Sequence, residues 1–323
     1  MGYVLVTGGA GYIGSVVCND LLKKGEKVHC YDNLANGDLN LLPRHENFKF
    51  FKGDLKDVKS LEFVFHEYNI DKVIHLAAHK AAGESEQNPG KYSDNIINMI
   101  NLLRVIVKYD VKKLVFSSSA TVYGNPSSGF ITEDEPVKPN NFYGHTKEIC
   151  EALIKKYAEV HGFNYVILRY FNVAGDVLGH IDKNPQNVLP ILMKAVVKTK
   201  REGQPAEFRI FGDDYLTPDG TCVRDYIHVQ DISNAHIKSL WVSGNHILNL
   251  GSGEPCSVEE LVEKVQELTG TELIVNCGKR RPGDPDILVS AYDQAKTTLE
   301  WCPKYDIKDM ILSMYEAYKK ADY

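Results

Sequence analysis

The first half of the chain alternates continuous apolar runs with amphipathic stretches. The apolar runs are rich in Val, Ile, Leu and Phe, which is typical of strands buried on both faces. They are YVLVTG (3–8), KVHCYD (27–32), FKFFKGD (48–54), KVIHLA (72–77), KLVFSS (113–118) and YVILRY (165–170). The stretches between them have helical periodicity and end near Gly or Asp. They are VVCNDLLKKG (16–25), DVKSLEFVFHEY (57–68), NIINMINLLRVIVKYD (95–110) and HTKEICEALIKKYAEVHG (145–162). This order predicts an α/β fold built on a Rossmann-type, doubly wound parallel sheet.

The alternation breaks after Phe171, where N-P, L-P, T-P-D-G and R-P-G-D mark a loop-rich region. A smaller C-terminal α/β lobe that binds substrate is expected there. RDYIHVQDISNAHIKSLW (224–241) and HILNLGSG (246–253) predict a helix and a strand that return to the sheet, and helical patterns start at Val258 and near the C-terminus. We therefore predict one domain over 1–171, joined by residues of about 224–250, and a second over 172–323.

Composition and charge exclude several classes of function. The chain has 323 residues, 43% of them hydrophobic and 25% charged, as in a soluble globular protein. A net charge of -6 and a pI near 6.0 provide no basic field for nucleic acid. The N-terminus has no signal-peptide pattern and no apolar run is long enough to cross a membrane, so we expect a cytoplasmic protein without a membrane partner.

The cysteines and histidines do not predict a metal site. The 7 cysteines are scattered and never spaced as C-x-x-C, which also argues against disulfides. G-D-D-Y-L-T-P-D-G-T (212–221) lacks the ligand spacing and terminal glutamate of a calcium loop, so a hairpin turn is the preferred interpretation. No H-E-x-x-H occurs among the 11 histidines, and His79 is given no role. No metal is predicted.

A glycine-rich turn follows the first apolar run. T-G-G-A-G-Y-I-G (7–14) contains G-x-G-x-x-G at Gly9, Gly11 and Gly14, with Gly8 adding an overlapping repeat. Between a strand and a helix, such glycines permit a tight turn and close approach of the backbone to a pyrophosphate, whose charge the helix N-terminus favours. This context predicts a dinucleotide site.

An acidic residue ends the second apolar run. Asp32 follows Gly14 by 18 residues, where a carboxylate can accept hydrogen bonds from a ribose 2′-hydroxyl and would repel a 2′-phosphate. NAD is therefore expected rather than NADP. Asp54 ends the third run and could reach the adenine, although a simple turn residue is an equally good interpretation.

Hydroxyl and amine groups gather where the fifth run ends. Ser117, Ser118 and Ser119 lie at the carboxyl end of a strand, and Tyr143 and Lys147 have the i, i+4 spacing that puts two side chains on one helix face. A lysine there would lower the pKa of the phenol, so that the tyrosine could remove a proton from a substrate hydroxyl. Ser119, Tyr143 and Lys147 are the predicted catalytic residues, with the serine orienting the hydroxyl.

The chain closely resembles the extended short-chain dehydrogenase/reductases, and within them the UDP-glucose 4-epimerases. The motifs that carry this resemblance are T-G-G-A-G-Y-I-G-S at 7, D-N-L at 32, H-L-A-A-H-K at 75, G-E-S at 83, S-S-S-A-T-V-Y-G at 117, Y-G-H-T-K at 143, R-Y-F-N at 169, G-T-C-V-R-D-Y-I-H-V at 220 and R-R-P-G-D at 280. The resemblance implies an isomerase of galactose metabolism that interconverts UDP-galactose and UDP-glucose through a transient 4-keto sugar. NAD would stay bound, residues 1–171 would hold it, and residues 172–323 would hold the nucleotide sugar.

The resemblance also implies two sets of binding residues. The expected cofactor set is Gly8, Gly11, Tyr12, Ile13, Gly14, Asp32, Asn33, Asp54, Leu55, Leu76, Ala77, Ala78, Lys80, Asn95, Ser117, Tyr143, Lys147 and Phe171. The expected substrate set is Lys80, Ser119, Tyr143, Asn172, Asn187, Phe211, Arg224, Tyr226, Arg281, Asp284 and Leu288. Within it, Arg224 and Arg281 would hold the diphosphate, because a planar guanidinium suits phosphate oxygens.

Some positions leave alternatives open. Ala78 stands where the family pattern has glycine, and Leu288 stands where the size of the residue is associated with acceptance of N-acetyl hexosamines. A UDP-N-acetylhexosamine or UDP-uronate 4-epimerase is therefore an alternative, and a non-catalytic NAD-binding regulator is a further one. A 4,6-dehydratase is disfavoured because Val122 and Tyr123 follow Thr121 in place of an Asp-Glu pair. The family also implies a homodimer formed through helices around Asn95–Asp110 and Lys147–His161.

Overall fold

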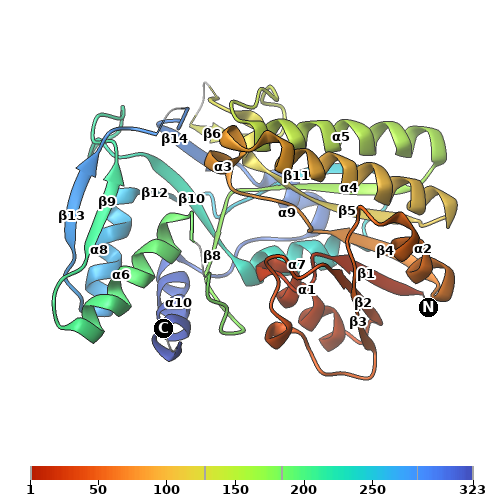
Figure 1. The fold of residues 1–323 in the computed structure, drawn as a ribbon. Helices are drawn as coiled ribbons and strands as arrows, with labels where there is room; N and C mark the ends of the chain where they lie inside the picture. Colours follow the sequence, from red (N-terminus) through yellow and green to blue (C-terminus); the bar gives the residue numbers. More distant parts are fainter. Residues whose placement is uncertain (1, 127–128, 183–184, 282, 322–323) are drawn as a thin grey trace.

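The computed structural model describes residues 2–126, 129–182, 185–281 and 283–321. Within them, seven strands form one parallel sheet in the order β11-β7-β5-β4-β1-β2-β3 (Figure 1). In chain order these strands are β1 (Tyr3–Thr7), β2 (Val28–Asp32), β3 (Phe48–Lys52), β4 (Ile70–His75), β5 (Lys113–Ser119), β7 (Asn164–Tyr170) and β11 (His246–Leu250). The strand order reverses at β1, between β2 and β4, which confirms the predicted doubly wound sheet.

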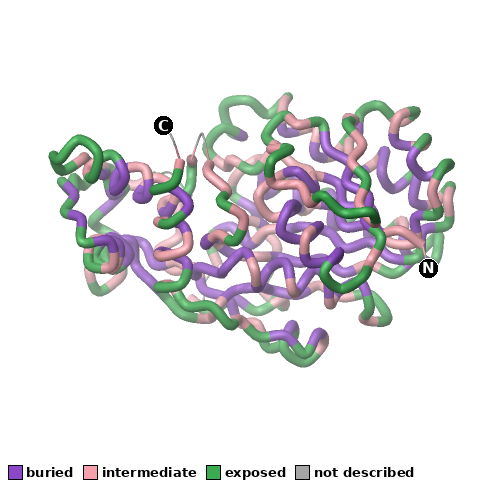
Figure 2. The backbone as a smooth tube through the Cα atoms, turned by 90° about the horizontal axis from the view of Figure 1, so that it is seen from below, coloured by how far each residue is buried: buried purple, intermediate pink, exposed green. Residues whose placement is uncertain are grey.

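Helices cover both faces of this sheet, and each face has its own apolar core. On one face lie α1 (Tyr12–Lys23), α7 (Val229–Ser239) and α9 (Asp293–Leu299); on the other lie α2 (Val58–Glu67), α4 (Pro89–Lys108) and α5 (Phe142–His161). The inner strands between them, such as β2 and β5, are almost entirely buried (Figure 2), whereas the edge strand β3 is not. Burial on both faces explains why their sequences are continuously apolar and do not alternate.

A smaller lobe is built mainly from the second half of the chain. Its helices are α6 (Val188–Glu202), α8 (Val258–Thr269) and α10 (Ile307–Lys320), which share an apolar core. Its strands are β6 (Phe130–Ile131), β8 (Asn172–Ala174), β10 (Val223–His228), β12 (Pro255–Ser257) and β14 (Ile287–Ser290), with β9 (Glu207–Phe211) and β13 (Ile274–Gly278) paired separately. β6 comes from the first half of the chain and β11 and α9 from the second, so each half contributes to the other lobe. The division at residue 171 stays a prediction.

Three local predictions differ from the structure. The region after Phe171 contains α6, a helix that buries Leu189, Leu192, Met193 and Val196 on one face. The residues before Val229 form β10, because Tyr226, Ile227 and His228 pair with β8. The 212–221 segment is not a β-hairpin, since β9 and β10 belong to different sheets.

The carboxyl ends of the parallel strands meet at one edge of the sheet. The glycine-rich turn follows β1, Asp32 ends β2, and Ser119 ends β5. Short elements complete this edge: η1 (Leu39–Leu41), α3 (Ala82–Gln87) and η2 (Ala120–Tyr123). In the part of the chain that is described, no helix has the length and apolar character to span a bilayer.

Candidate active site

The glycine-rich turn presses directly against helix α1. A Cβ atom on Gly14 would lie 2.2 Å from the carbonyl oxygen of Gly8 and 2.7 Å from the Cα of Gly9, and neither backbone atom can move away cheaply. Gly11 is the N-cap and provides no side-chain hydrogen bond to the first turn of α1. The N-terminus of α1 is therefore close-packed and uncapped, which suits an anionic group such as a pyrophosphate.

Asp32 holds its carboxylate beside this turn. One carboxylate oxygen accepts from the Ala10 N–H at 3.0 Å and the other from the Leu34 N–H at 2.8 Å. Each oxygen can still accept a further hydrogen bond, for example from a ribose hydroxyl. At the end of the next strand, Asn33 donates to Asp54 at 3.1 Å. The turn, the uncapped helix and the acidic residue fit an NAD molecule.

The loop after β4 borders the same edge of the sheet. Its first residue, Leu76, donates its backbone N–H to Thr7 O at 3.0 Å. Asn95 fixes the loop further along, accepting from the His79 N–H at 2.9 Å and donating to His79 O at 3.1 Å and to Thr146 Oγ1 at 3.2 Å. These bonds give Asn95 a positioning role, whereas Lys80 is exposed.

Ser119, Tyr143 and Lys147 come together where β5 ends. Tyr143 is in the first turn of α5, and its hydroxyl lies near enough to the Ser119 side chain for that side chain to lower the pKa of the phenol. Lys147 lies one turn further along and donates to Ser117 O at 2.6 Å. Both α5 side chains are buried, with exposed fractions of 9% for Tyr143 and 3% for Lys147. The structure thus unites the three predicted catalytic residues.

The start of α5 is fixed by neighbouring polar groups. Ser85 Oγ accepts from the Tyr143 N–H at 3.0 Å, and the Glu86 carboxylate accepts from the Phe142 N–H at 2.6 Å. The Asn141 side chain caps the helix by accepting from the Gly144 N–H at 2.8 Å. These bonds satisfy N–H groups that a helix start leaves unpaired and hold the Tyr143 backbone in place.

The electrostatics differ from the expectation that Lys147 lowers the pKa of the phenol. Burial raises the pKa of Tyr143 to about 12, and the hydrogen bond to Ser119 only partly offsets this. Burial also lowers the pKa of Lys147 to about 8, against the attraction of Cys150 and Glu151. Desolvation of both side chains therefore dominates, and without ligands Tyr143 is a neutral phenol near pH 7.

A buried ion pair lies behind the catalytic residues and was missed in the sequence. Arg169 on β7 binds Glu151 on α5 through both nitrogens of its fork, with Nε 2.9 Å from Oε1 and Nη2 2.5 Å from Oε2. Both residues are 2% exposed. Burial opposes the charge of the guanidinium, but hydrogen bonding to Glu151 outweighs burial and raises the pKa of Arg169. The pair is bidentate and fully enclosed.

This ion pair is linked to both sides of Ser119. On one side, Ser118 Oγ donates to Glu151 Oε1 at 2.6 Å. On the other, Arg169 donates to the Tyr123 hydroxyl at 3.0 Å, which in turn donates to Asn249 at 2.7 Å. Ser118 precedes the catalytic serine and Tyr123 ends η2, which follows it. The position of Ser119 is therefore determined from both neighbours.

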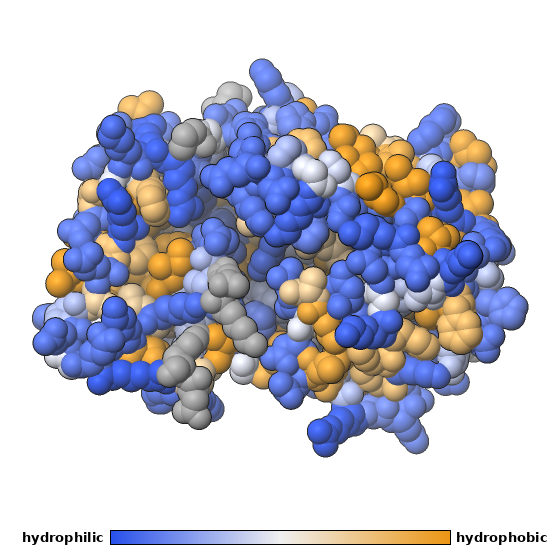
Figure 3. Space-filling view, viewed as in Figure 1, coloured by the Kyte–Doolittle hydropathy of each residue, from blue (hydrophilic) through white to orange (hydrophobic). Residues whose placement is uncertain are grey.

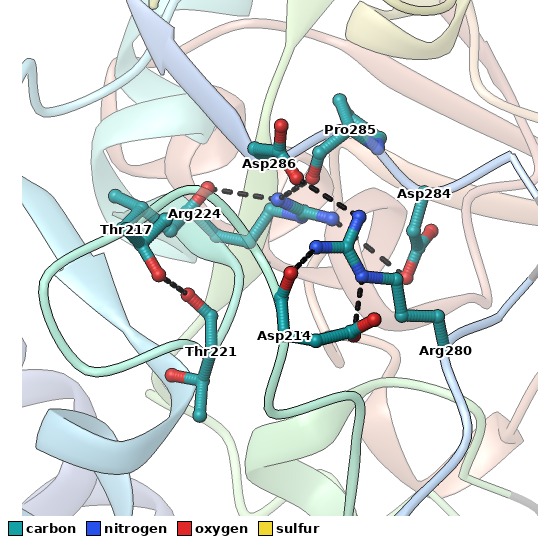
Figure 4. A network of polar contacts seen from close by, with 9 residues as sticks. Asp214, Thr217, Thr221, Arg224, Arg280, Asp284, Pro285 and Asp286 are labelled. Atoms are coloured by element: carbon teal, nitrogen blue, oxygen red, sulfur yellow. Dashed lines mark hydrogen bonds and ion pairs between the residues drawn. The ribbon is translucent and has the colours of Figure 1, made fainter.

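Arg224 and Arg281, the two residues predicted to bind the diphosphate, belong to the smaller lobe. Arg224 on β10 donates to Pro285 O at 2.8 Å and lies 3.7 Å from the Asp284 carboxylate (Figure 4). Leu288 on β14 pairs with Arg224 and packs against an apolar cluster that includes Val122 and Tyr123 of η2. One predicted substrate residue therefore packs against a cluster to which the segment after Ser119 contributes.

Arg280, which was not predicted as a site residue, connects two loops of the smaller lobe. It binds Asp214 at 2.6 Å and Asp286 at 3.2 Å (Figure 4). Its guanidinium also lies 3.9 Å from the centroid of the Tyr215 ring. Arg280 thereby fastens the 213–221 loop to the segment before β14. The repeated arginine of R-R-P-G-D was the signal that could have revealed it.

The remaining residues predicted to bind the substrate differ from one another in burial and in their contacts. Arg281 lies over the Phe211 ring, 4.4 Å from its centroid. Asn172 donates to Asp225 O at 3.0 Å, and Asn187 precedes α6 without using its side chain as a cap. Tyr226 is buried, its hydroxyl has no partner among the described residues, and its side chain lines a cavity of about 110 Å³.

No group of three or more potential metal ligands occurs in the described ranges.

Comparison with known proteins extends over both lobes. Residues 4–251 match the NAD dependent epimerase/dehydratase family. A UDP-glucose 4-epimerase from Halalkalibacterium halodurans is 42% identical over 313 residues, covering 94% of this chain and 91% of that protein.

Solved structures of UDP-glucose 4-epimerases are also similar to this chain over nearly its whole length. UDP-glucose 4-epimerase from Brucella ovis in complex with NAD superposes with a TM-score of 0.92 at 35% identity and 99% coverage of both chains. UDP-glucose 4-epimerase from Bifidobacterium longum in complex with NAD+ and UDP has a TM-score of 0.90 at 36% identity and 98% coverage of both chains.

The close packing at Gly14 generates a prediction about cofactor affinity. Gly14→Ala brings a methyl group against backbone atoms of the turn, so α1 must move away from it. Overpacking of about 1–3 kcal/mol should weaken NAD binding roughly 5- to 150-fold. Titration of the nucleotide-free protein with NAD in a calorimeter measures this. Gly90→Ala is the matched control, since a Cβ there meets nothing within 4 Å. An unchanged dissociation constant for Gly14→Ala would refute the argument.

The Arg169–Glu151 pair generates a prediction about stability. Glu151→Gln leaves a buried guanidinium without a counter-charge and should lower the free energy of unfolding by about 3–5 kcal/mol. The double variant Glu151→Leu, Arg169→Met removes both charges and should recover most of that loss. Urea unfolding followed by circular dichroism compares the two. A loss below about 0.5 kcal/mol in Glu151→Gln would match a surface pair and contradict the assignment.

Proposed function

Because the chain belongs to the NAD dependent epimerase/dehydratase family, we propose that it interconverts UDP-galactose and UDP-glucose by inverting the C4 centre of the sugar. The observation that carries the proposal is the meeting of Ser119, Tyr143 and Lys147 at the edge of the sheet that also bears the glycine-rich turn. A proton acceptor and a nicotinamide site on one edge are what oxidation of a secondary alcohol requires.

Tyr143 acts on the hydroxyl group at C4. Ser119 hydrogen-bonds the tyrosine and orients the sugar hydroxyl, so that the phenolic oxygen takes its proton. When bound, NAD supplies the acceptor and later the donor of a hydride, together with a positive charge that favours the phenolate. Lys147 adds its own charge near the phenol, with Nζ 5.7 Å from the ring centroid. Loss of the proton and hydride leaves a ketone at C4.

Inversion requires the keto sugar to turn over while the rest of the molecule stays bound. Arg224 and Arg281 supply guanidinium groups for the diphosphate, and Phe211, which is partly exposed and stacked with Arg281, supplies a ring for the base. These groups belong to the smaller lobe, whereas the proton acceptor belongs to the larger one. Anchoring the nucleotide in one lobe leaves the hexose free to rotate against the other.

The pocket near C2 of the sugar leaves a second candidate function. Leu288 packs beside the segment after Ser119, and its side chain is intermediate in size between an excluding aromatic residue and a permissive small one. UDP-glucose and UDP-galactose are the proposed main substrates, with slow turnover of UDP-N-acetylhexosamines. A UDP-uronate 4-epimerase is the remaining alternative substrate class.

Two other functions are less well supported. A dehydratase needs acids after Thr121, but Val122 and Tyr123 are 0% and 1% exposed and contribute to an apolar cluster. A non-catalytic NAD-binding regulator has no need for a buried lysine and tyrosine aligned on one helix. The proposed physiological setting is galactose metabolism in the cytoplasm.

We also propose that the protein is a homodimer. Helices α4 and α5 lie side by side on one face, and apolar side chains gather over them (Figure 3). Ile97 on α4 and Ile149 on α5 are exposed at 45% and 41%. An exposed apolar patch shared by two long helices suits a symmetric helix-to-helix interface. The proposed domains are residues 1–171 for NAD and 172–323 for the nucleotide sugar.

Incubation with UDP-galactose in the absence of added NAD tests the proposal. Proton NMR should show UDP-glucose growing to a stable mixture, because the cofactor is regenerated in each cycle. Tyr143→Phe, which lacks the phenolic proton acceptor, should react at least about 100-fold more slowly. Tyr305→Phe, a change outside the site, should react at the parent rate. If neither the parent nor the NAD-supplemented protein converts any UDP-sugar, the epimerase function is wrong.

A further inference from the structure

A segment of the smaller lobe reaches over the glycine-rich turn. This segment, residues 175–182, directly follows β8. Tyr12, the first residue of α1, donates its hydroxyl to Gly175 O. The Tyr12 ring is also stacked on His180, with ring centroids 4.8 Å apart and planes inclined by 27°. The 175–182 segment therefore contacts the turn directly through a side chain of α1.

The segment is held rigidly against the smaller lobe. The Asp176 carboxylate accepts from the backbone N–H groups of Gly179 and His180, both at 2.7 Å. The N–H of Asp176 donates to Ser313 Oγ at 3.1 Å and that of Asp182 to Tyr318 Oη at 3.2 Å, and both acceptors lie on α10. His180 is thus fixed in position above the first turn of α1.

A histidine and a lysine lie near each other at this place, among three aspartates. His180 lies close enough to Lys80 for the lysine charge to act on it: burial lowers the pKa of His180 first and Lys80 adds to the effect, while Asp182, Asp176 and Asp38 oppose it. Lys80 forms no ion pair with any described residue. The imidazole, stacked on the first residue of α1 and with this lysine near it, lies beside the uncapped helix N-terminus where a pyrophosphate is expected.

We propose that His180 binds the pyrophosphate of NAD and that its contact with Tyr12 retains the cofactor in the site. The inference rests on the proposed function only in its use of NAD. Retention has a chemical purpose, since a reduced cofactor that left before the second hydride transfer would strand the keto sugar. His180 belongs to the smaller lobe, so it joins the two lobes across the cofactor.

Exchange of bound NAD with added radiolabelled NAD tests the proposal. The holoprotein is mixed with labelled NAD without any nucleotide sugar, and incorporation of label is followed by rapid filtration. His180→Phe preserves stacking on Tyr12 but removes the polar nitrogen atoms, and it should exchange about tenfold faster, as expected for one lost charge-assisted hydrogen bond. His180→Ala should exchange at least as fast. Val177→Ala, an exposed position in the same segment, is the control and should match the parent.

The outcomes separate this proposal from the epimerase function. Parent-like exchange in His180→Phe would overturn it, because stacking alone would then suffice. Parent-like exchange in both His180 variants of a protein that epimerises UDP-galactose would overturn this proposal and leave the epimerase function intact. Fast exchange in both His180 variants of a protein without epimerase activity would support this proposal and count against the epimerase function. Thermal unfolding of each variant verifies that it is folded.

Discussion

The buried ion pair between Arg169 and Glu151 determines where helix α5 lies on the sheet. Removing two charges from water is costly, and apolar residues of the same size would often be at least as stable. What the pair provides is a unique geometry, because a guanidinium and a carboxylate meet in a planar, bidentate arrangement. Through Ser118 and Tyr123 that geometry passes to Ser119, and through the helix it passes to Tyr143 and Lys147. The positions of the three proposed catalytic residues therefore depend on a buried polar network that packs beside them.

The exchange of segments between the lobes has a related consequence. β6 leaves the first half of the chain to pair with β14, while β11 and α9 return from the second half to the large sheet. The side chains proposed to bind the nucleotide and the proposed proton acceptor therefore lie on lobes that exchange segments and cannot separate freely. A reaction in which one part of the substrate rotates while another stays bound needs such a fixed relation.

The sequence was most informative where a residue pattern has one physical interpretation. Continuous apolar runs predicted the first six strands of the large sheet, and the glycine spacing with Asp32 predicted the turn against which α1 packs. The sequence was less informative where the three-dimensional surroundings of a segment decide whether it forms a helix, a strand or a loop. α6 was missed because the L-P pair at 189–190 signals a loop, although proline is tolerated in the first turn of a helix. The RDYIH segment was predicted as helix, but it forms most of β10. The strands that pair with it, β8, β12 and β14, are distant in the sequence, so no local pattern could reveal the pairing.

The chemistry of the site shows the same limit. Tyr143 and Lys147 could be paired from their spacing, but the pKa of the phenol depends on burial by residues that spacing does not reveal. Glu151 and Arg169 are 18 residues apart, and no local pattern marks a charged pair as buried. Arg280 and Arg281 are neighbours of the same residue type, and only the structure shows that Arg280 pairs with Asp214 and Asp286 whereas Arg281 lies over the Phe211 ring. These roles follow from the three-dimensional packing, which the sequence pattern alone does not supply.

In the proposed reaction, hydrogen leaves C4 as a hydride and returns to the same carbon of the same molecule. UDP-galactose bearing deuterium at C4 tests it most directly, mixed with carbon-13-labelled UDP-galactose that bears ordinary hydrogen. After incubation in water, mass spectrometry should find the deuterium still at C4 of the UDP-glucose and confined to the molecules that began with it. Deuterium lost to the solvent, or transferred to the carbon-13-labelled molecules, would contradict the account.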